Sequence, residues 1–453
     1  IEGFLTFSDR RDLREQAFRA WINRGAGGGA TDNAEILAEI VRLRAEMAKL
    51  KGYASYADYA LADTMAKTPA AVRELLDRVW PAAKARALEE RDALANRVRS
   101  EGANFKIEPW DWRYYAERER KARYDLDEGE LRAYLKLDNV VAAAFDTASR
   151  LFGLRFTELA DAPRYHPDVR VFDVTDATGN HVAVFMADYF ARSGKRSGAW
   201  MTSLRTGHKL DGKSVRPIVL NVMNFARGDT PESTLISMDD ARTLFHEFGH
   251  GLHGMLSNVT YPSIAGTAVA RDFVELPSQL FEHWFGEPEV LRRFALHHET
   301  GEPMPQSLID RLNAAQKFNQ GFATVEYTAC AMLDIELHTL PEASAFDAAE
   351  FEREALDRIG MPAEIVMRHR LPHFTHITGG YAAGYYSYLW SEVMDADAFA
   401  AFKEAGDIYD PSVAERLKTA IYAAGNSQDP HDAYIAFRGR PPKIEGLLHK
   451  RGL

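Results

Sequence analysis

The sequence predicts a mainly helical protein with one small β-sheet near the middle of the chain. Apolar residues recur at helical spacing through residues 9–155 and 238–453, whereas residues 165–226 show the alternation and turn signals of strands. The length of 453 residues also allows two or three units with a large core. We expect three parts along the chain: a helical lobe segment at 1–160, a small sheet region at 161–235 and a second helical region at 236–453.

The first helices are predicted from amphipathic periodicity and from their caps. Thr68 and Pro69 open the longest one, because Thr caps a helix and Pro fits its first turn. The glycine run at 25–29 is interpreted as a flexible connector, since it lacks the Lys-Ser/Thr of a phosphate loop, and the aromatic run at 109–115 as a break. The predicted helices are Asp9–Trp21, Asp32–Leu50, Thr68–Glu101 and Asp127–Phe152.

The sheet region contains a predicted hairpin. Val169–Val174 and His181–Tyr189 flank the turn signal DATGN, and Val215–Met223 is a further strand. Ala191–Met201, rich in glycine and cations, lies between them. Helices are then predicted at Asp239–Leu256, Val274–Trp284, Glu287–His298, Pro305–Thr339, Ala348–Ile359, Ala382–Glu404 and Pro411–Ala424.

Composition excludes several classes of protein. The net charge of −11 and the absence of a basic-aromatic stripe argue against nucleic-acid binding. The single cysteine, Cys330, rules out an internal disulfide and a cysteine-based zinc cluster. It favours a reducing compartment, so we expect the cytoplasm, with the periplasm as the alternative. The longest apolar run, near residues 140–145, is too short to span a membrane, and we therefore expect no membrane partner.

The strongest chemical signal is the string HEFGH at residues 246–250. His246 and His250 are four residues apart on a predicted helix, so both imidazoles lie on one face and can bind one metal ion. Glu247 is placed to take a proton from water beside that ion. A chance match is the alternative. A capping box at Ser237-x-x-Asp240 and an apolar stripe favour a real zinc helix.

The same helix predicts two further features. Gly249 and Gly251 are poor helix residues, which indicates that another part of the protein approaches closely there. His253 is interpreted as a hydrogen-bonded histidine near the helix end, with a polar role beside the metal as the alternative.

A catalytic zinc ion takes a third protein ligand. The extended pattern HExxHxxGxxH would supply it as a third histidine, but this sequence has Leu256 at that position. Glu275 on the next predicted helix offers one, while Glu282 or Asp272 can orient a ligand imidazole. The alternative is a solvated acidic face. The apolar neighbours of Glu275 indicate burial instead, and a buried carboxylate needs a partner.

A third group of residues lies near the end of the chain. Tyr381, Tyr385 and Tyr388 are predicted to share a helical face, and a phenol is a good donor to the oxyanion of a tetrahedral intermediate. Gly379 and Gly380 allow a hinge beside them. On periodicity alone, an aromatic core stripe is the favoured interpretation.

These strings together resemble the thimet oligopeptidase family of zinc metallopeptidases. FHEFGHGLHG, RDFVELPSQLFEHW and HITGGYAAGYYSYLWSEV carry the resemblance, and FARSGKRSGAWM and PPKIEGLLHKRGL place it nearest the bacterial peptidyl-dipeptidases. The resemblance implies one zinc ion per chain, a general base at Glu247 and hydrolysis of short unstructured peptides with release of C-terminal dipeptides. The residues it implicates are His246, His250 and Glu275 as zinc ligands, Tyr381 and Tyr388 as donors to the oxyanion or substrate backbone, His376 and Tyr385 along the substrate, and Gly198 and Ala199 as an edge that pairs with it.

The resemblance also implies a two-lobed helical fold with a deep central cleft and the zinc at its floor. Family members carry a further N-terminal helical region, so we expect that this chain is a piece of a longer protein, with that region as a possible partner. Lys195, Arg196 and Arg271 are candidates for holding the substrate carboxylate. Two alternatives stay open: an endo-acting oligopeptidase with the same chemistry, and a zinc-binding fragment with little activity.

Overall fold

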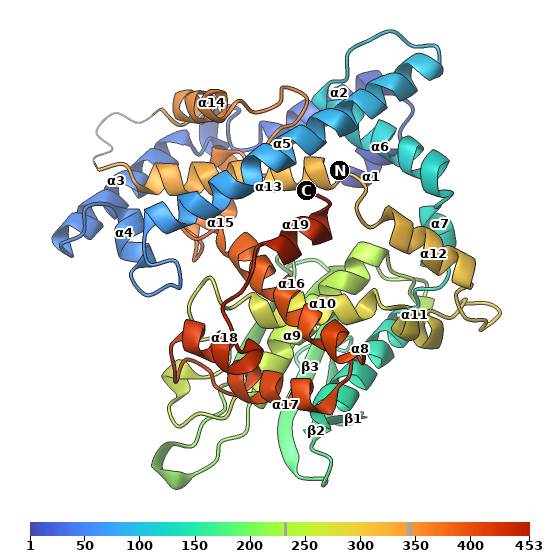
Figure 1. Cartoon of the computed structure of the whole chain (residues 1–453), viewed down its shortest axis with the longest axis vertical. Helices are drawn as coiled ribbons and strands as arrows, with labels where there is room; N and C mark the ends of the chain where they lie inside the picture. The colour runs from blue at the N-terminus through green and yellow to red at the C-terminus, as the bar shows by residue number, and fades with distance from the viewer. Residues whose placement is uncertain (231–232, 342–346) are drawn as a thin grey trace. The chain divides into compact units, whose positions relative to one another are not determined.

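The computed structural model describes residues 1–230, 233–341 and 347–453 (Figure 1). The chain folds into two compact units. Unit 1 contains Ile1–Asp125, Ala314–Trp390 and Leu448–Leu453, and unit 2 contains Leu126–Asn313 and Ser391–Leu447. The three-part division along the sequence stays a prediction. The expectation of a mainly helical protein with a small sheet before the HExxH helix is confirmed.

Unit 1 is built from helices. The long α5 (Pro69–Ser100) packs along α13 (Gln320–His338), and the two lie side by side in Figure 1. Thr68 caps α5 by accepting from the Ala71 N–H, as the sequence predicts. The other helices of the unit are α1 (Glu2–Phe7), α2 (Arg11–Ile22), α3 (Ala34–Leu50), α4 (Tyr56–Leu61), α6 (Pro109–Tyr124), α14 (Ala348–Ile359) and α15 (Thr375–Thr378).

Two predictions that concern helices of this unit are wrong. The aromatic run at 109–115 is not a break but the start of α6. Pro109 fits the first turn there, and Glu108 and Asp111 form a capping box. The predicted helix 305–339 is interrupted between α12 (Gln306–Ala315) and α13. Asn319 there has a left-handed φ of 58°, and its side chain accepts a hydrogen bond from the Trp112 indole.

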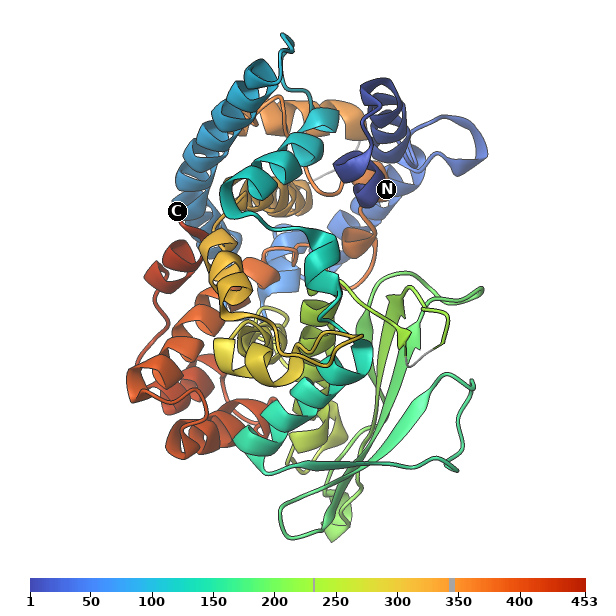
Figure 2. The ribbon, with the colours of Figure 1, turned by 90° about the vertical axis from the view of Figure 1, so that its right-hand side faces the viewer.

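Unit 2 contains one five-stranded sheet in the order β1-β2-β3-β5-β4, seen from the side in Figure 2. The predicted hairpin is confirmed, because β2 and β3 pair antiparallel across the 176–180 turn. β3 and β5 are parallel, and β4 pairs antiparallel with β5 at the edge. The strands are β1 (Arg155–Glu158), β2 (Arg170–Thr175), β3 (His181–Phe190), β4 (Trp200–Arg205) and β5 (Ile218–Phe225).

The HExxH string lies on α9 (Met238–Leu256) in unit 2. α9 packs against α10 (Leu276–Phe285) and against the sheet, and buried Phe248 contacts Phe185 of β3 and Phe281 of α10. A predicted helix at 127–152 is broken after residue 132. The remaining helices are α7 (Glu128–Arg132), α8 (Leu137–Phe152), α11 (Pro288–Phe294), α12, most of α16 (Ser387–Ala405), α17 (Pro411–Leu417) followed by a π-helical turn at Lys418–Tyr422, α18 (Pro430–Arg438) and the start of α19 (Glu445–Arg451).

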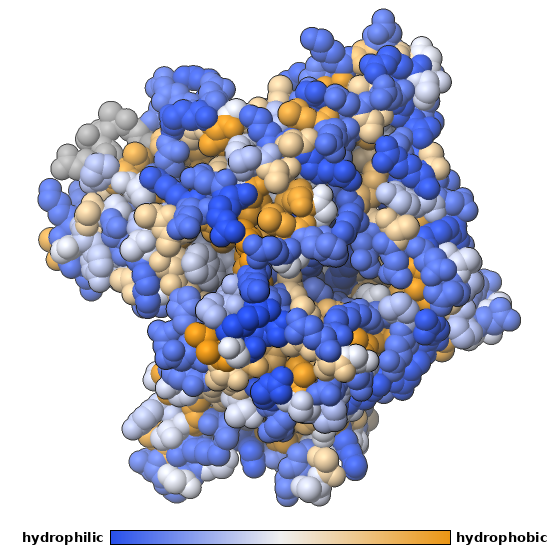
Figure 3. All heavy atoms as spheres, viewed as in Figure 1, coloured by the Kyte–Doolittle hydropathy of each residue, from blue (hydrophilic) through white to orange (hydrophobic). Residues whose placement is uncertain are grey.

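The face of the molecule in Figure 3 agrees with the charged composition. Hydrophilic side chains cover most of the face in Figure 3, with hydrophobic ones in small groups between them. Among the described residues, no helix is long and apolar enough to cross a membrane.

Candidate metal centre

Glycines let α9 approach its neighbours closely. A Cβ at Gly249 would lie only 2.8 Å from the Pro277 carbonyl oxygen at the start of α10. A Cβ at Gly251 would lie 3.3 Å from Asn221 Oδ1 on β5, and one at Gly254 would meet Met201 of β4. The close approach predicted from Gly249 and Gly251 is confirmed. The glycines bring the HExxH helix within reach of both α10 and the sheet.

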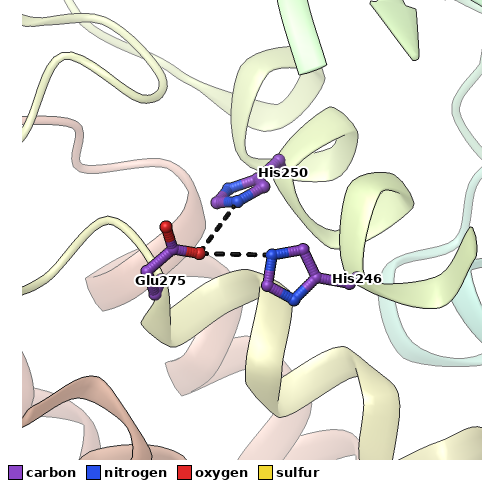
Figure 4. A group of neighbouring side chains, drawn as sticks. All are labelled: His246, His250 and Glu275. Atoms are coloured by element: carbon purple, nitrogen blue, oxygen red, sulfur yellow. Dashed lines mark hydrogen bonds and ion pairs between the residues drawn. The ribbon is translucent and has the colours of Figure 1, made fainter. Parts of the chain in front are cut away.

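The two histidines of α9 and the glutamate before α10 converge on one point (Figure 4). Oε2 of Glu275 lies 3.2 Å from Nε2 of His246 and 3.1 Å from Nε2 of His250. Ligands about 2.05 Å from a tetrahedral zinc ion are about 3.3 Å apart. Two imidazoles and one carboxylate at this spacing fit a catalytic zinc site, which leaves its fourth position for water.

A second carboxylate orients one of the imidazoles. Nδ1 of His246 lies 2.7 Å from Oε1 of Glu282, so the Nδ1 proton donates to Glu282 and the Nε2 lone pair points toward the convergence point. Of the two acids predicted for this role, Glu282 makes the contact. Ser278, which the sequence does not single out, donates from Oγ to Oε2 of Glu275 and fixes that carboxylate.

The group contains two buried carboxylates. Glu275 is 3% exposed; burial opposes its charge, yet the two histidines hold its pKa well below its ordinary value. Glu247 is also buried, and burial raises the pKa of its carboxyl. Among the described residues, none donates a hydrogen bond to Oε2 of Glu247. A carboxylate with an unused acceptor beside a metal site can receive a proton from water.

His253 does not match its prediction. It is fully buried, and neither ring nitrogen has a hydrogen-bond partner among the described residues. Burial lowers its pKa to about 3, so the ring is neutral, and it packs against Tyr422. Its place on the far end of α9 gives it a packing role, and the hydrogen bond expected for it is absent from the described structure.

The edge strand β4 begins directly after Gly198 and Ala199. Met201 faces α9, so its neighbour Trp200 faces the opposite side of the sheet. Arg196 stacks on Trp200, with the guanidinium carbon 4.5 Å from the ring centroid, on that opposite side.

Lys195 also lies away from α9. It donates to Asp188, whose strand partner Val222 shares the opposite face with Trp200. Two of the three candidate anchors for a substrate carboxylate therefore lie on the far face of the sheet. Arg271 stays a candidate at an exposed position four residues before Glu275.

In unit 1, the structure brings the predicted aromatic residues together without the predicted helix. α16 begins at Ser387, and residues 380–386 form turns in which Ala383 has a φ of 55°. The rings of Tyr381 and Tyr388 nevertheless stack, with centroids 5.2 Å apart. The His376 ring contacts both of these rings. The Tyr385 ring contacts Tyr388 and His376. The prediction that these side chains lie together is therefore confirmed, but the predicted shared helical face is wrong, because turns and not a helix carry Tyr381 and Tyr385.

The fold and the His-His-Glu group together are those of a metallopeptidase. More particularly, the chain belongs to peptidase family M3, whose model matches residues 4–453. The family resemblance drawn from the motifs is thereby confirmed.

Relatives of known name have similar sequences over nearly the whole of this chain. A dipeptidyl carboxypeptidase of Salmonella typhimurium is 40% identical over 456 residues, which cover 100% of this chain and 66% of that protein. Oligopeptidase A of Escherichia coli is 35% identical over 460 residues, which cover 99% of this chain and 67% of that protein. The chain thus spans about two-thirds of the length of these relatives.

Solved structures support the fold. The structure of PZ peptidase A with an inhibitor matches with a TM-score of 0.59 at 13% identity, over 99% of this chain and 69% of that one. A Pyrococcus furiosus carboxypeptidase matches with a TM-score of 0.51 at 12% identity, over 97% of this chain and 78% of that one. At these identities the matches concern the fold alone.

Proposed function

We propose that this chain hydrolyses peptide bonds in short peptides with one zinc ion and releases dipeptides from the C-terminus. The observation that carries the proposal is the convergence of His246, His250 and Glu275 on one point, with Glu247 in the same helix. A bound zinc ion supplies Lewis acidity and lowers the pKa of water. Glu247 takes the proton from the attacking water and passes it to the leaving amine.

The tyrosines of unit 1 extend this proposal. Tyr381 and Tyr388 donate from their phenols to the oxyanion or to the substrate backbone, while His376 and Tyr385 contact the substrate. Their stacked and edge-on rings support a joint role, because each phenol is held by its neighbours. Preorganised donors contribute strongly to catalysis when they match the charge that develops in the transition state.

The peptide is proposed to add to the sheet beside Gly198 and Ala199, at the free side of β4. The register of α9 on the sheet supports this. Gly251 packs on Asn221, which pairs with Met201. One helical turn back from Gly251 to Glu247 is about 6 Å, or about two strand residues, which leads from Met201 to Ala199. A peptide paired there would pass at the level of the proposed base.

The endo-acting alternative is favoured by one observation, the 35% identity to oligopeptidase A. The fragment alternative follows from the length, since this chain spans about two-thirds of its relatives. We propose short peptides as the substrate and zinc as the metal, with the cytoplasm as the compartment. An additional N-terminal region of the same protein is the proposed partner of this chain.

Mass spectrometry of peptide digests tests the proposal. The zinc-loaded protein is incubated with a short peptide, and with its C-terminally amidated copy, beside a Glu247→Gln variant. We expect sequential loss of two residues from the free-acid peptide only, and none with the variant. Internal cleavage of both peptides would replace the proposal with an oligopeptidase. Absence of cleavage despite one bound zinc per chain would show that this piece holds the metal without turnover.

A further inference from the structure

Three connected polar side chains, two of them buried and the third partly buried, contact the segment that carries the tyrosines. We call residues 378–386 the tyrosine turn, and Arg44, His338 and Asp334 the polar relay. Asp334 is 1% exposed and His338 is 2% exposed, so water solvates neither the carboxylate nor the imidazole. Buried polar groups of this kind need partners, and a fully connected network fixes the segment it contacts.

Asp334 holds the second half of the tyrosine turn. Its Oδ1 accepts from the Ala383 N–H at 2.9 Å, and its Oδ2 accepts from the Tyr385 N–H at 2.9 Å. Both oxygens of one carboxylate are thus used on backbone amides two residues apart. Between the tyrosines, Ala383 adopts a φ of 55°, a left-handed conformation that costs free energy in a residue other than glycine. The hydrogen bonds to Asp334 offset that cost.

His338 and Arg44 complete the relay. The guanidinium of Arg44 determines which nitrogen of the His338 ring donates and which accepts. A guanidinium only donates, so Nε2 of His338, 3.1 Å from Arg44, accepts, and the ring proton resides on Nδ1. Nδ1 donates to the backbone carbonyl oxygen of Asp334 at 2.9 Å, and it also lies 2.9 Å from Oδ1 of the same residue.

Arg44 also reaches the other end of the turn. It donates to the Ile377 carbonyl at 2.6 Å, directly before the tyrosine turn. One network therefore contacts both ends of the tyrosine turn: Arg44 holds the entry at Ile377, and Asp334 holds Ala383 and Tyr385.

We propose that Asp334, supported by His338 and Arg44, is a positioning residue that sets the tyrosine turn in the conformation in which Tyr381 and Tyr388 act on the substrate. This inference rests on the function proposed above for the two tyrosines. Asp334 touches no substrate in this account. It acts through the backbone of Ala383 and Tyr385, which lie between and beside the stacked rings.

The test compares Asp334→Asn with a matched control in the whole chain. The asparagine keeps the shape, but one of the two backbone amides then faces an NH₂ group. Glu90 is the control, because its carboxylate also accepts from two backbone amides, those of Gly321 and Phe322, at the start of α13. Glu90→Gln makes the same chemical change away from the tyrosine turn.

Two readouts are measured. Hydrogen exchange of the Ala383 and Tyr385 amides is expected to speed up about tenfold to a hundredfold in Asp334→Asn and to stay unchanged in Glu90→Gln. For peptide hydrolysis, kcat falls about tenfold in Asp334→Asn with KM nearly constant and zinc affinity unchanged. In a Tyr381→Phe background, the further loss from Asp334→Asn shrinks, because both changes act through one group.

The outcomes separate the two proposals. Unchanged exchange at Ala383 and Tyr385 in Asp334→Asn would overturn the positioning role, whatever the activity of the enzyme. An equal fall in kcat for Glu90→Gln would also overturn it, because a general loss of packing would then explain both variants. If the wild-type chain cleaves no peptide, the proposed function fails, and the exchange readout still decides whether the relay holds the turn.

Discussion

The metal group of unit 2, which consists of His246, His250 and Glu275, and the tyrosine turn of unit 1 are organised in opposite ways. His246 and His250 share a regular helix, so a spacing of four residues suffices to place both rings. Tyr381 lies within an irregular turn and Tyr388 just after it, and the shape of that turn depends on Asp334 and Arg44, about 50 and 330 residues away in the sequence. Local periodicity determines the first region, and long-range polar contacts determine the second.

The largest effect is expected at the metal group. His250→Ala removes one of the three converging ligands, so we expect loss of stoichiometric zinc and of peptidase activity. Metal analysis after dialysis against a weak chelator measures this. Zinc retained at one ion per chain by the variant would contradict the assignment of His250.

The next effect separates binding of the metal from its use. Glu247→Gln keeps the shape of the side chain but removes the proton acceptor, and general-base catalysis contributes about 10²–10⁴-fold. We expect a loss in kcat of that order with zinc content unchanged. Steady-state kinetics beside metal analysis measure both quantities, and a variant with wild-type turnover would require another base.

A smaller effect is expected from the carboxylate behind His246. Glu282→Gln weakens the acceptor of the Nδ1 proton, and changes of this kind lower metal affinity by about tenfold to a hundredfold. Competition with a chromophoric chelator gives the affinity. If Glu282→Gln binds zinc as tightly as the wild type, the 2.7 Å contact does not tune the site.

Packing of α9 against α10 gives a further prediction. Gly249→Ala places a Cβ 2.8 Å from the Pro277 carbonyl oxygen, so α9 and α10 must move apart at about 1–3 kcal/mol of unfolding free energy. Chemical denaturation measures that cost, and zinc affinity is expected to fall with it because Glu275 lies beside Pro277. If Gly249→Ala changes neither the unfolding free energy nor the zinc affinity, the close approach of α9 to α10 is unimportant.

The smallest effect is expected at His253. Its neutral ring is buried with no hydrogen-bond partner among the described residues, so His253→Leu removes no hydrogen bond and relieves an unsatisfied polar group. We expect unchanged zinc content and equal or slightly higher stability. A large loss of zinc in this variant would mean that His253, like His250, contributes to the metal group.

The sequence predicts much of the metal group and little of the tyrosine turn, for physical reasons. Glu275 and Glu282 were found because they follow HExxH on a helix with apolar neighbours, although Ser278 gave no signal as their partner. The sequence predicts the start of α16 five residues too early, since nothing in the local string requires Ala383 to adopt a positive φ. Periodicity does not predict strand β4, because its glycine-rich approach and short length resemble a loop; only the family resemblance implies an edge beside it, at Gly198 and Ala199.

The central claim is that His246, His250 and Glu275 hold one metal ion. X-ray absorption at the zinc edge, on protein loaded with zinc and then dialysed, tests it most directly. We expect one zinc per chain with two imidazole nitrogens and carboxylate or water oxygens at about 2.0–2.2 Å, and loss of the bound zinc in His250→Ala. A wild-type chain that retains no zinc, or a zinc environment unchanged in His250→Ala, would contradict the account.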